Sequence, residues 1–132
     1  MQLDPTKYLT PCIFYAPGKF EPKSITTRTS QMDVVPSILG LLGLSYESRF
    51  YGIDQIHSPI DRPVPIGTYQ RLGFYGKNEM IILSPKKGVK AYQKVSNDFE
   101  EIPSTKSSIL GNAIGLYQSA YDRYSKGVMD EK

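Results

Sequence analysis

Three strand-like segments separated by short turns constrain the fold of this chain more than any other feature of its sequence. They are Val64–Leu72, Glu79–Ser84 and Val89–Val95, and each is rich in apolar or β-branched residues. The connecting segments, Gly73–Asn78 and Pro85–Gly88, carry the glycine, proline and asparagine that are typical of turns. Because such short connections join strands that run in opposite directions, the sequence predicts an antiparallel meander.

An amphipathic helix is predicted after the meander, from about Ser107 to Lys126. Ser107 or Ser108 can cap its start, and Gly127 can end it. Its apolar and aromatic side chains recur at spacings of three and four residues, which places them on one helix face. They are Ile109, Ala113, Leu116, Tyr117, Ala120, Tyr121 and Tyr124. We therefore expect an α+β fold, in which a small antiparallel sheet of three to four strands is packed by a C-terminal helix.

The short apolar run Cys12–Ala16 is closed by Pro17 and Gly18 and predicts a strand that is buried on both faces. Cys12 is then expected to be a buried thiol that only packs. Strands of this kind usually lie in a parallel or mixed sheet under helices. This chain supplies few partners for such a strand.

A second helix is predicted in the first half of the chain. Ser30 and Asp33 fit the aspartate form of a capping box. Pro36 suits the first helical turn, and Gly43 suits the position after the last turn. The expected apolar face consists of Val34, Val35, Ile38, Leu39, Leu41 and Leu42.

Two regions follow from these elements. Residues 1–60 are expected to form a strand–loop–helix unit, which ends in a long irregular connection over residues 44–63. Residues 61–132 are expected to form one compact subdomain from the meander and the last helix, with residues 96–106 as a polar loop.

Composition excludes several classes of protein but selects none. The chain has 132 residues, 39% of them hydrophobic, and no apolar stretch approaches the length of a membrane helix. A single cysteine and a single histidine exclude an internal disulfide and metal sites built from several of either residue. The first residues lack the layout of a signal peptide. These observations predict a soluble globular chain.

The net charge of +3 is concentrated in the second half of the chain. Its basic residues between positions 71 and 94, opposed by Glu79 alone, are Arg71, Lys77, Lys86, Lys87, Lys90 and Lys94. One interpretation is a patch that faces an anion, with Tyr69 and Arg71 on one strand face and Lys86 and Lys87 at a hairpin tip. The other is solvated turns and lysines that guard a strand edge. Nothing resembles a nucleic-acid-binding module.

No catalytic residue or metal ligand is predicted from the motifs. His57 has no adjacent nucleophile motif, so we expect an exposed loop histidine. Asp54 and Asp61 flank it, but a divalent metal site normally needs three or four ligands of firm geometry.

Three motifs follow one another along the chain. They are Pro11–Gly18, the stretch Ser30–Gly43 that begins Ser-Gln-Met-Asp-Val-Val-Pro-Ser, and the Phe50–Asp54 turn. Their order and spacing resemble the C-terminal portion of the sulfatase family within the alkaline phosphatase superfamily, closest to the lipoteichoic acid synthase-like phosphoglycerol transferases. Tyr69–Gly76, Ile81–Pro85 and the tyrosine-rich last helix extend the resemblance over nearly the whole chain. Ser37 stands where threonine is commoner.

The resemblance implies structural roles for one set of residues, namely Ser30, Gln31, Asp33 and Pro36 at the helix start and Gly52 and Asp54 in the turn. Family members transfer or hydrolyse phosphoryl or sulfuryl esters with a threonine, serine or modified cysteine nucleophile. Their divalent metals (Mn, Mg, Ca or Zn) are held by Asp, His and Glu residues upstream of the matched region. The resemblance therefore implies no catalytic residue, metal ligand or cofactor in this chain itself.

We expect this chain to be a C-terminal subdomain of such an enzyme, inactive alone, that packs on an upstream catalytic domain of the same polypeptide and self-associates without it. The resemblance implies a parent enzyme in the bacterial cell membrane, with its catalytic domain outside the cytoplasm and an anionic lipid or phosphoglycerol substrate. The alternative is a stand-alone binding module whose basic hairpin contacts an anionic surface.

Overall fold

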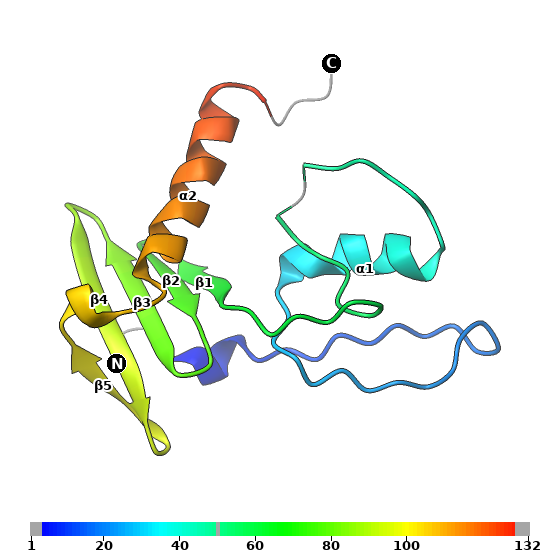
Figure 1. Cartoon of the computed structure of the whole chain (residues 1–132), viewed down its shortest axis with the longest axis horizontal. Helices are drawn as coiled ribbons and strands as arrows, with labels where there is room; N and C mark the ends of the chain where they lie inside the picture. Colours follow the sequence, from blue (N-terminus) through cyan, green and yellow to red (C-terminus); the bar gives the residue numbers. More distant parts are fainter. Residues whose placement is uncertain (1–3, 50, 129–132) are drawn as a thin grey trace. The chain divides into compact units, whose positions relative to one another are not determined.

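The computed structural model describes residues 4–49 and 51–128, which fall into two compact units. One unit is Asp4–Asp61, the other begins at Arg62, and each is described by itself. The first contains η1 (Pro5–Tyr8), η2 (Gln31–Asp33) and α1 (Val34–Leu41). The second contains β1 (Val64–Thr68), β2 (Arg71–Tyr75), β3 (Glu79–Ser84), β4 (Gly88–Val95), β5 (Asp98–Ile102), η3 (Ser104–Lys106) and α2 (Leu110–Ser125) (Figure 1).

The described residues of the second unit form a five-stranded antiparallel sheet in the order β1-β2-β3-β4-β5. Every strand pairs with its neighbours in the sequence, as the short turns require. The predicted α+β arrangement of an antiparallel meander and a C-terminal helix is confirmed. The sheet has five strands rather than three or four.

Two local errors account for the difference in strand number. The predicted strand Val64–Leu72 is a hairpin, because β1 ends at Thr68 and β2 starts at Arg71, and these two residues are paired. The Thr68 hydroxyl also accepts a hydrogen bond from the Gln70 amide at 3.3 Å. The second error is β5, which lies in the predicted polar loop. It is an edge strand with mostly exposed side chains, so its sequence lacks a clear apolar alternation.

The core of the second unit lies between one face of the sheet and α2. Phe74, Ile81, Ala91 and Ala113 are its buried residues. Half-buried side chains from strands and helix surround them, namely Leu83, Ile102, Ile109, Leu110 and Leu116. This packing bears out the apolar face expected for the last helix at Ala113 and Leu116. Tyr121 and Tyr124, expected on the same face, are instead 70% and 79% exposed. Gly127, at φ 62°, ends that helix as expected.

The opposite face of the sheet also buries side chains. Met80 and Ile82 are fully buried there, and the Tyr75 and Phe99 rings meet edge to face with centroids 6.1 Å apart. The register places Tyr75 in one row with Met80 and Tyr92. Since β2 and β5 are separated by two strands, the two rings reach toward each other across that row.

The start of α2 is fixed by Glu79 of β3. Its carboxylate accepts hydrogen bonds from the Ser107 hydroxyl at 2.5 Å, the Ser108 amide at 3.0 Å and the Ser108 hydroxyl at 2.6 Å. The sequence predicts that Ser107 or Ser108 caps the helix itself. The helix starts later, at Leu110, without a side-chain cap, and the serines instead join its leading segment to the sheet.

The predicted strand at Cys12–Ala16 is wrong. This segment is irregular, Cys12 is exposed, and the side chains of Ile13 and Tyr15 are 82% and 86% exposed. A strand needs a hydrogen-bonded neighbour, and the described residues contain none for this segment. The first half of the chain is therefore a loop-and-helix unit.

The predicted start and end of α1 are confirmed, but its predicted apolar face is not buried. Ser30 and Asp33 form the capping box around η2, which leads directly into α1. The buried residues of α1 are Pro36 and Ser37, whereas Leu42, just beyond its end, is 65% exposed. None of the helices in residues 4–49 and 51–128 has the length and apolar character to cross a membrane.

Candidate functional site

The motif residues of the first half converge on the Asp33 carboxylate. One carboxylate oxygen accepts a hydrogen bond from the Ser30 amide at 2.8 Å, which is half of the capping box. The other oxygen accepts from the Ile53 amide at 2.9 Å, twenty residues along the chain. Asp33 is fully buried. A single side chain therefore fixes both the start of α1 and the turn that contains Gly52 and Asp54.

Two glycines allow this close approach. A Cβ at Gly52 would overlap the Met32 carbonyl group, and a Cβ at Gly40 would overlap the Asp54 carboxylate. The first overlap is with backbone, which has little freedom to move. The glycine in the turn is thus required by packing against the backbone of η2. At Gly40 the overlap is with the side chains of Asp54 and His57, which would have to shift.

Ser37 and Gln55 form a second connection between α1 and this loop. The Ser37 hydroxyl accepts a hydrogen bond from the Gln55 amide at 3.1 Å. The Gln55 side chain, 2% exposed, donates to the Ile60 carbonyl at 3.0 Å and accepts from the Ile60 amide at 2.9 Å. Sequence reasoning gave neither residue this role. The signal in the sequence was the position of Gln55, a polar residue between the Gly52 turn and Pro59.

Asp54 and His57 form an oriented pair in the same loop. His57 Nδ1 lies 2.7 Å from Asp54 Oδ2, and Asp54 Oδ1 accepts from the Ile56 amide at 2.8 Å and the His57 amide at 3.2 Å. Burial opposes ionisation of Asp54, but the hydrogen bonds from the His57 ring and the two amides outweigh it. The pKa of Asp54 is therefore lowered from its usual value.

The geometry decides which histidine nitrogen is free. An ionised carboxylate can only accept, so Nδ1 is the donor and Nε2 keeps its lone pair when the ring is neutral. The His57 side chain is 57% exposed, as expected for a loop histidine. This arrangement suits a hydrogen-bond acceptor or a single metal ligand. The pairing with Asp54 was missed, although the spacing of three residues was a visible signal.

Asp61, considered beside Asp54 and His57 as a metal ligand, is bound elsewhere. Its carboxylate forms an ion pair with Arg28 at 3.0 Å. Within the described residues, no three His, Cys, Asp or Glu side chains are grouped so that they could hold a metal ion.

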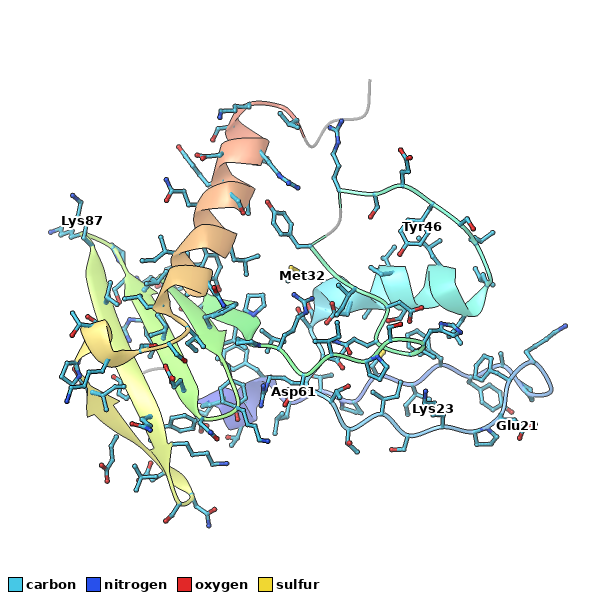
Figure 2. All side chains as sticks on the ribbon, in the orientation of Figure 1. Glu21, Lys23, Met32, Tyr46, Asp61 and Lys87 are labelled. Atoms are coloured by element: carbon cyan, nitrogen blue, oxygen red, sulfur yellow. The ribbon has the colours of Figure 1, made fainter. Side chains whose placement is uncertain are left out.

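The four residues considered for anion contact lie at one end of the sheet. Lys86 and Lys87 occupy the β3–β4 turn, as the hairpin prediction requires, and Lys87 projects from the tip in Figure 2. Tyr69 and Arg71 do not share a strand face, because Tyr69 is in the β1–β2 turn and is 95% exposed. In a meander, these two turns are at the same end of the sheet, so the four residues are neighbours in the fold.

Comparisons with known proteins add no identification. No protein-family description, no curated protein and no solved structure that was compared with this chain matches it.

Proposed function

We propose that this chain is the C-terminal portion of a metal-dependent enzyme that transfers or hydrolyses phosphoryl or sulfuryl esters, similar to the phosphoglycerol transferases. The proposal is carried by the way two separate motifs assemble. The Ser30–Asp33 helix start and the Gly52–Asp54 turn are joined through the Asp33 carboxylate and through the packing of Gly52 on Met32. Agreement between motif order and physical contact supports a shared structural unit.

Uncovered apolar side chains in Asp4–Asp61 support a missing partner surface. Ile13 and Tyr15 are almost fully exposed, and Leu9 is 76% exposed. The apolar side of α1 is also open, with Val35 at 49%. Exposed apolar side chains that are close in sequence mark contact sites. In this proposal, they pack against the upstream catalytic domain of the same polypeptide. Without that domain, they favour self-association.

The parent enzyme supplies the chemistry in this proposal. Its upstream domain provides the nucleophile and the Asp, His and Glu ligands of a divalent metal. This chain completes the fold of the enzyme and contributes no reacting group. The parent is a bacterial membrane-anchored enzyme whose catalytic domain lies outside the cytoplasm and acts on an anionic lipid or phosphoglycerol substrate.

The test begins with the coding sequence upstream of Met1 in the same reading frame. We expect it to encode a domain with a threonine, serine or cysteine nucleophile and an Asp-His pair. Produced separately, that domain should bind this chain, and the Ile13→Glu/Tyr15→Glu variant should bind at least tenfold more weakly. The matched control is Tyr121→Glu/Tyr124→Glu, which changes two exposed residues of α2 and should bind normally.

Three results would overturn the proposal. The first is an upstream reading frame that lacks such a domain. The second is equal loss of binding in both double variants. The third is turnover of p-nitrophenyl phosphate or p-nitrophenyl sulfate by this chain alone with Mn²⁺ or Mg²⁺.

A further inference from the structure

The end of the sheet that carries the β1–β2 and β3–β4 turns concentrates positive charge. Arg71 starts β2, Lys86 and Lys87 form the tip of the β3–β4 hairpin, and Lys90 follows in β4. The segments 66–73 and 83–90, which build this end, contain no aspartate or glutamate. Lys90 is partly neutralised by an ion pair with Glu101 at 3.1 Å. Arg71, Lys86 and Lys87 provide the remaining charge.

The backbone at the hairpin tip is unfavourable for the residues that occupy it. Lys86 and Lys87 both have φ 61°, in the left-handed region that side chains with a Cβ rarely adopt. Asparagine and glycine are the residues that usually occupy such positions in hairpin turns. Two adjacent lysines in this conformation depart from that preference, and strained backbone of this kind is common at functional sites.

Exposed apolar side chains lie beside these cations. Tyr69 lies in the neighbouring turn and is 95% exposed. Leu72 and Val89 are 43% and 36% exposed, and the pairing of both with Leu83 places them in one row near the same end, on the sheet face that carries α2. Arg71 precedes Leu72 in β2 and therefore points to the other face of this end. Basic side chains mixed with an exposed tyrosine and aliphatic residues match the boundary of a bilayer, where phosphates meet acyl chains.

We propose that this end of the sheet, defined as Tyr69, Arg71, Leu72, Lys86, Lys87 and Val89, is a docking surface for the headgroups of an anionic phospholipid bilayer. Lys86, Lys87 and Arg71 contact the phosphates, and Tyr69 rests at the interface. A nucleic acid would use the same charges but has no need of the exposed leucine and valine. This inference stands on the second unit alone and does not depend on the proposed function.

The test uses the full chain and vesicles of phosphatidylserine or phosphatidylcholine, in a co-sedimentation assay. We expect binding to phosphatidylserine that weakens as salt rises, and no binding to phosphatidylcholine. Each lysine near an anionic surface contributes about a fivefold factor, so Lys86→Asn/Lys87→Gly should weaken binding roughly thirtyfold. Because asparagine and glycine relieve the strained turn, the same variant should unfold at an equal or higher temperature.

The matched control removes two lysines from the opposite end of the same sheet. Lys77 lies in the β2–β3 turn and Lys94 near the end of β4, and both are exposed. Lys77→Asn/Lys94→Asn should change binding by less than about threefold. Tyr69→Ser should weaken binding without changing its salt dependence, whereas Tyr124→Ser on α2 should have no effect.

Four results would overturn the proposal. These are no preference for phosphatidylserine at low salt, equal weakening in the two lysine pairs, inhibition of vesicle binding by millimolar glycerol phosphate, and tighter lysine-dependent binding to a DNA or RNA duplex than to vesicles. The third result would assign the surface to a free phosphate, and the fourth would assign it to nucleic acid.

Discussion

The Asp33 carboxylate accepts a hydrogen bond from the Ile53 amide at 2.9 Å and thereby ties the start of α1 to a turn twenty residues away. The same buried carboxylate also accepts from the Ser30 amide. Few apolar residues are buried around it, since the buried residues of α1 are Pro36 and Ser37. The first unit is therefore organised around a polar centre rather than an apolar core.

Asp33→Ala should strongly destabilise the first unit. The substitution leaves two backbone amides without their acceptor, and hydrogen bonds to a charged group are each worth about 1.5–3 kcal/mol. We expect the free energy of unfolding of α1 to fall by about 2–4 kcal/mol, measured by urea denaturation followed through the NMR amide signals of residues 30–60. Asp98→Ala, at an exposed carboxylate that accepts a hydrogen bond from the next amide, should change it by less than about 0.5 kcal/mol.

Two glycine substitutions should have opposite effects on stability. Gly52→Ala pushes a methyl group into the Met32 carbonyl, and overpacking of this kind costs about 1–3 kcal/mol. Gly115 lies inside α2, and a Cβ at this position would meet open space, so Gly115→Ala should stabilise the second unit by about 0.5–1 kcal/mol. Urea denaturation of each variant measures both changes. A neutral Gly52→Ala would contradict the close approach of the turn to η2.

The sequence allowed good prediction of structure that depends on local patterns. The capping box at Ser30 and Asp33 was recognisable, because both of its partners lie within one turn. The meander followed from short connections, and Gly43 and Gly127 were recognisable as helix ends with positive φ. These features depend on neighbours in the sequence, which are visible without a structure.

Features that depend on distant partners were beyond the sequence. The apolar run at Cys12–Ala16 looks like a buried strand, but burial requires a neighbouring strand that the described residues do not supply. The β1–β2 turn at Tyr69 was hidden because neither turn residue is glycine, proline or asparagine. The Asp54–His57 pair has a visible spacing of three residues, but the spacing alone does not show that Asp33 and Gln55 hold the loop in the conformation that brings the two side chains together.

Glu79→Gln should make the second unit less stable at neutral pH and less sensitive to acid. Burial opposes ionisation of Glu79, but hydrogen bonds from Ser107, Ser108 and the Ile109 amide outweigh it, so its pKa is lowered. Because the pKa of Glu79 is lower in the folded state than in the unfolded chain, where it is near 4.3, the ionised carboxylate stabilises the fold above about pH 4.3. This stabilisation is lost as the pH falls through the pKa that Glu79 has in the folded state.

The unfolding free energies of wild type and Glu79→Gln should therefore differ more at pH 7 than at pH 3. We expect a difference of about 1–2 kcal/mol at pH 7, from the weakened hydrogen bonds. Glu100→Gln, at an exposed position of β5, is the matched control and should follow the wild type at both pH values. A difference that is the same at pH 7 and pH 3 would contradict the role of the ionised carboxylate.

The free energy of unfolding of the wild type should fall at alkaline pH because Tyr117 ionises, and Tyr117→Phe should not show this fall. The Tyr117 hydroxyl donates to the Gly73 carbonyl at 2.5 Å, and burial raises its pKa to about 12. In the unfolded chain the pKa of the Tyr117 hydroxyl is about 10. The protonated hydroxyl therefore stabilises the fold fully below pH 10, and this stabilisation is lost between about pH 10 and 12. At pH 8, Tyr117→Phe should cost about 1 kcal/mol for the missing hydrogen bond, and the deficit should shrink or reverse at pH 11.5. Thermal unfolding at both pH values measures the stability difference between Tyr117→Phe and wild type. Tyr121→Phe, at an exposed position, is the control. If the stability lost in Tyr117→Phe grows with pH, Tyr117 is ionised in the folded state and the prediction is wrong.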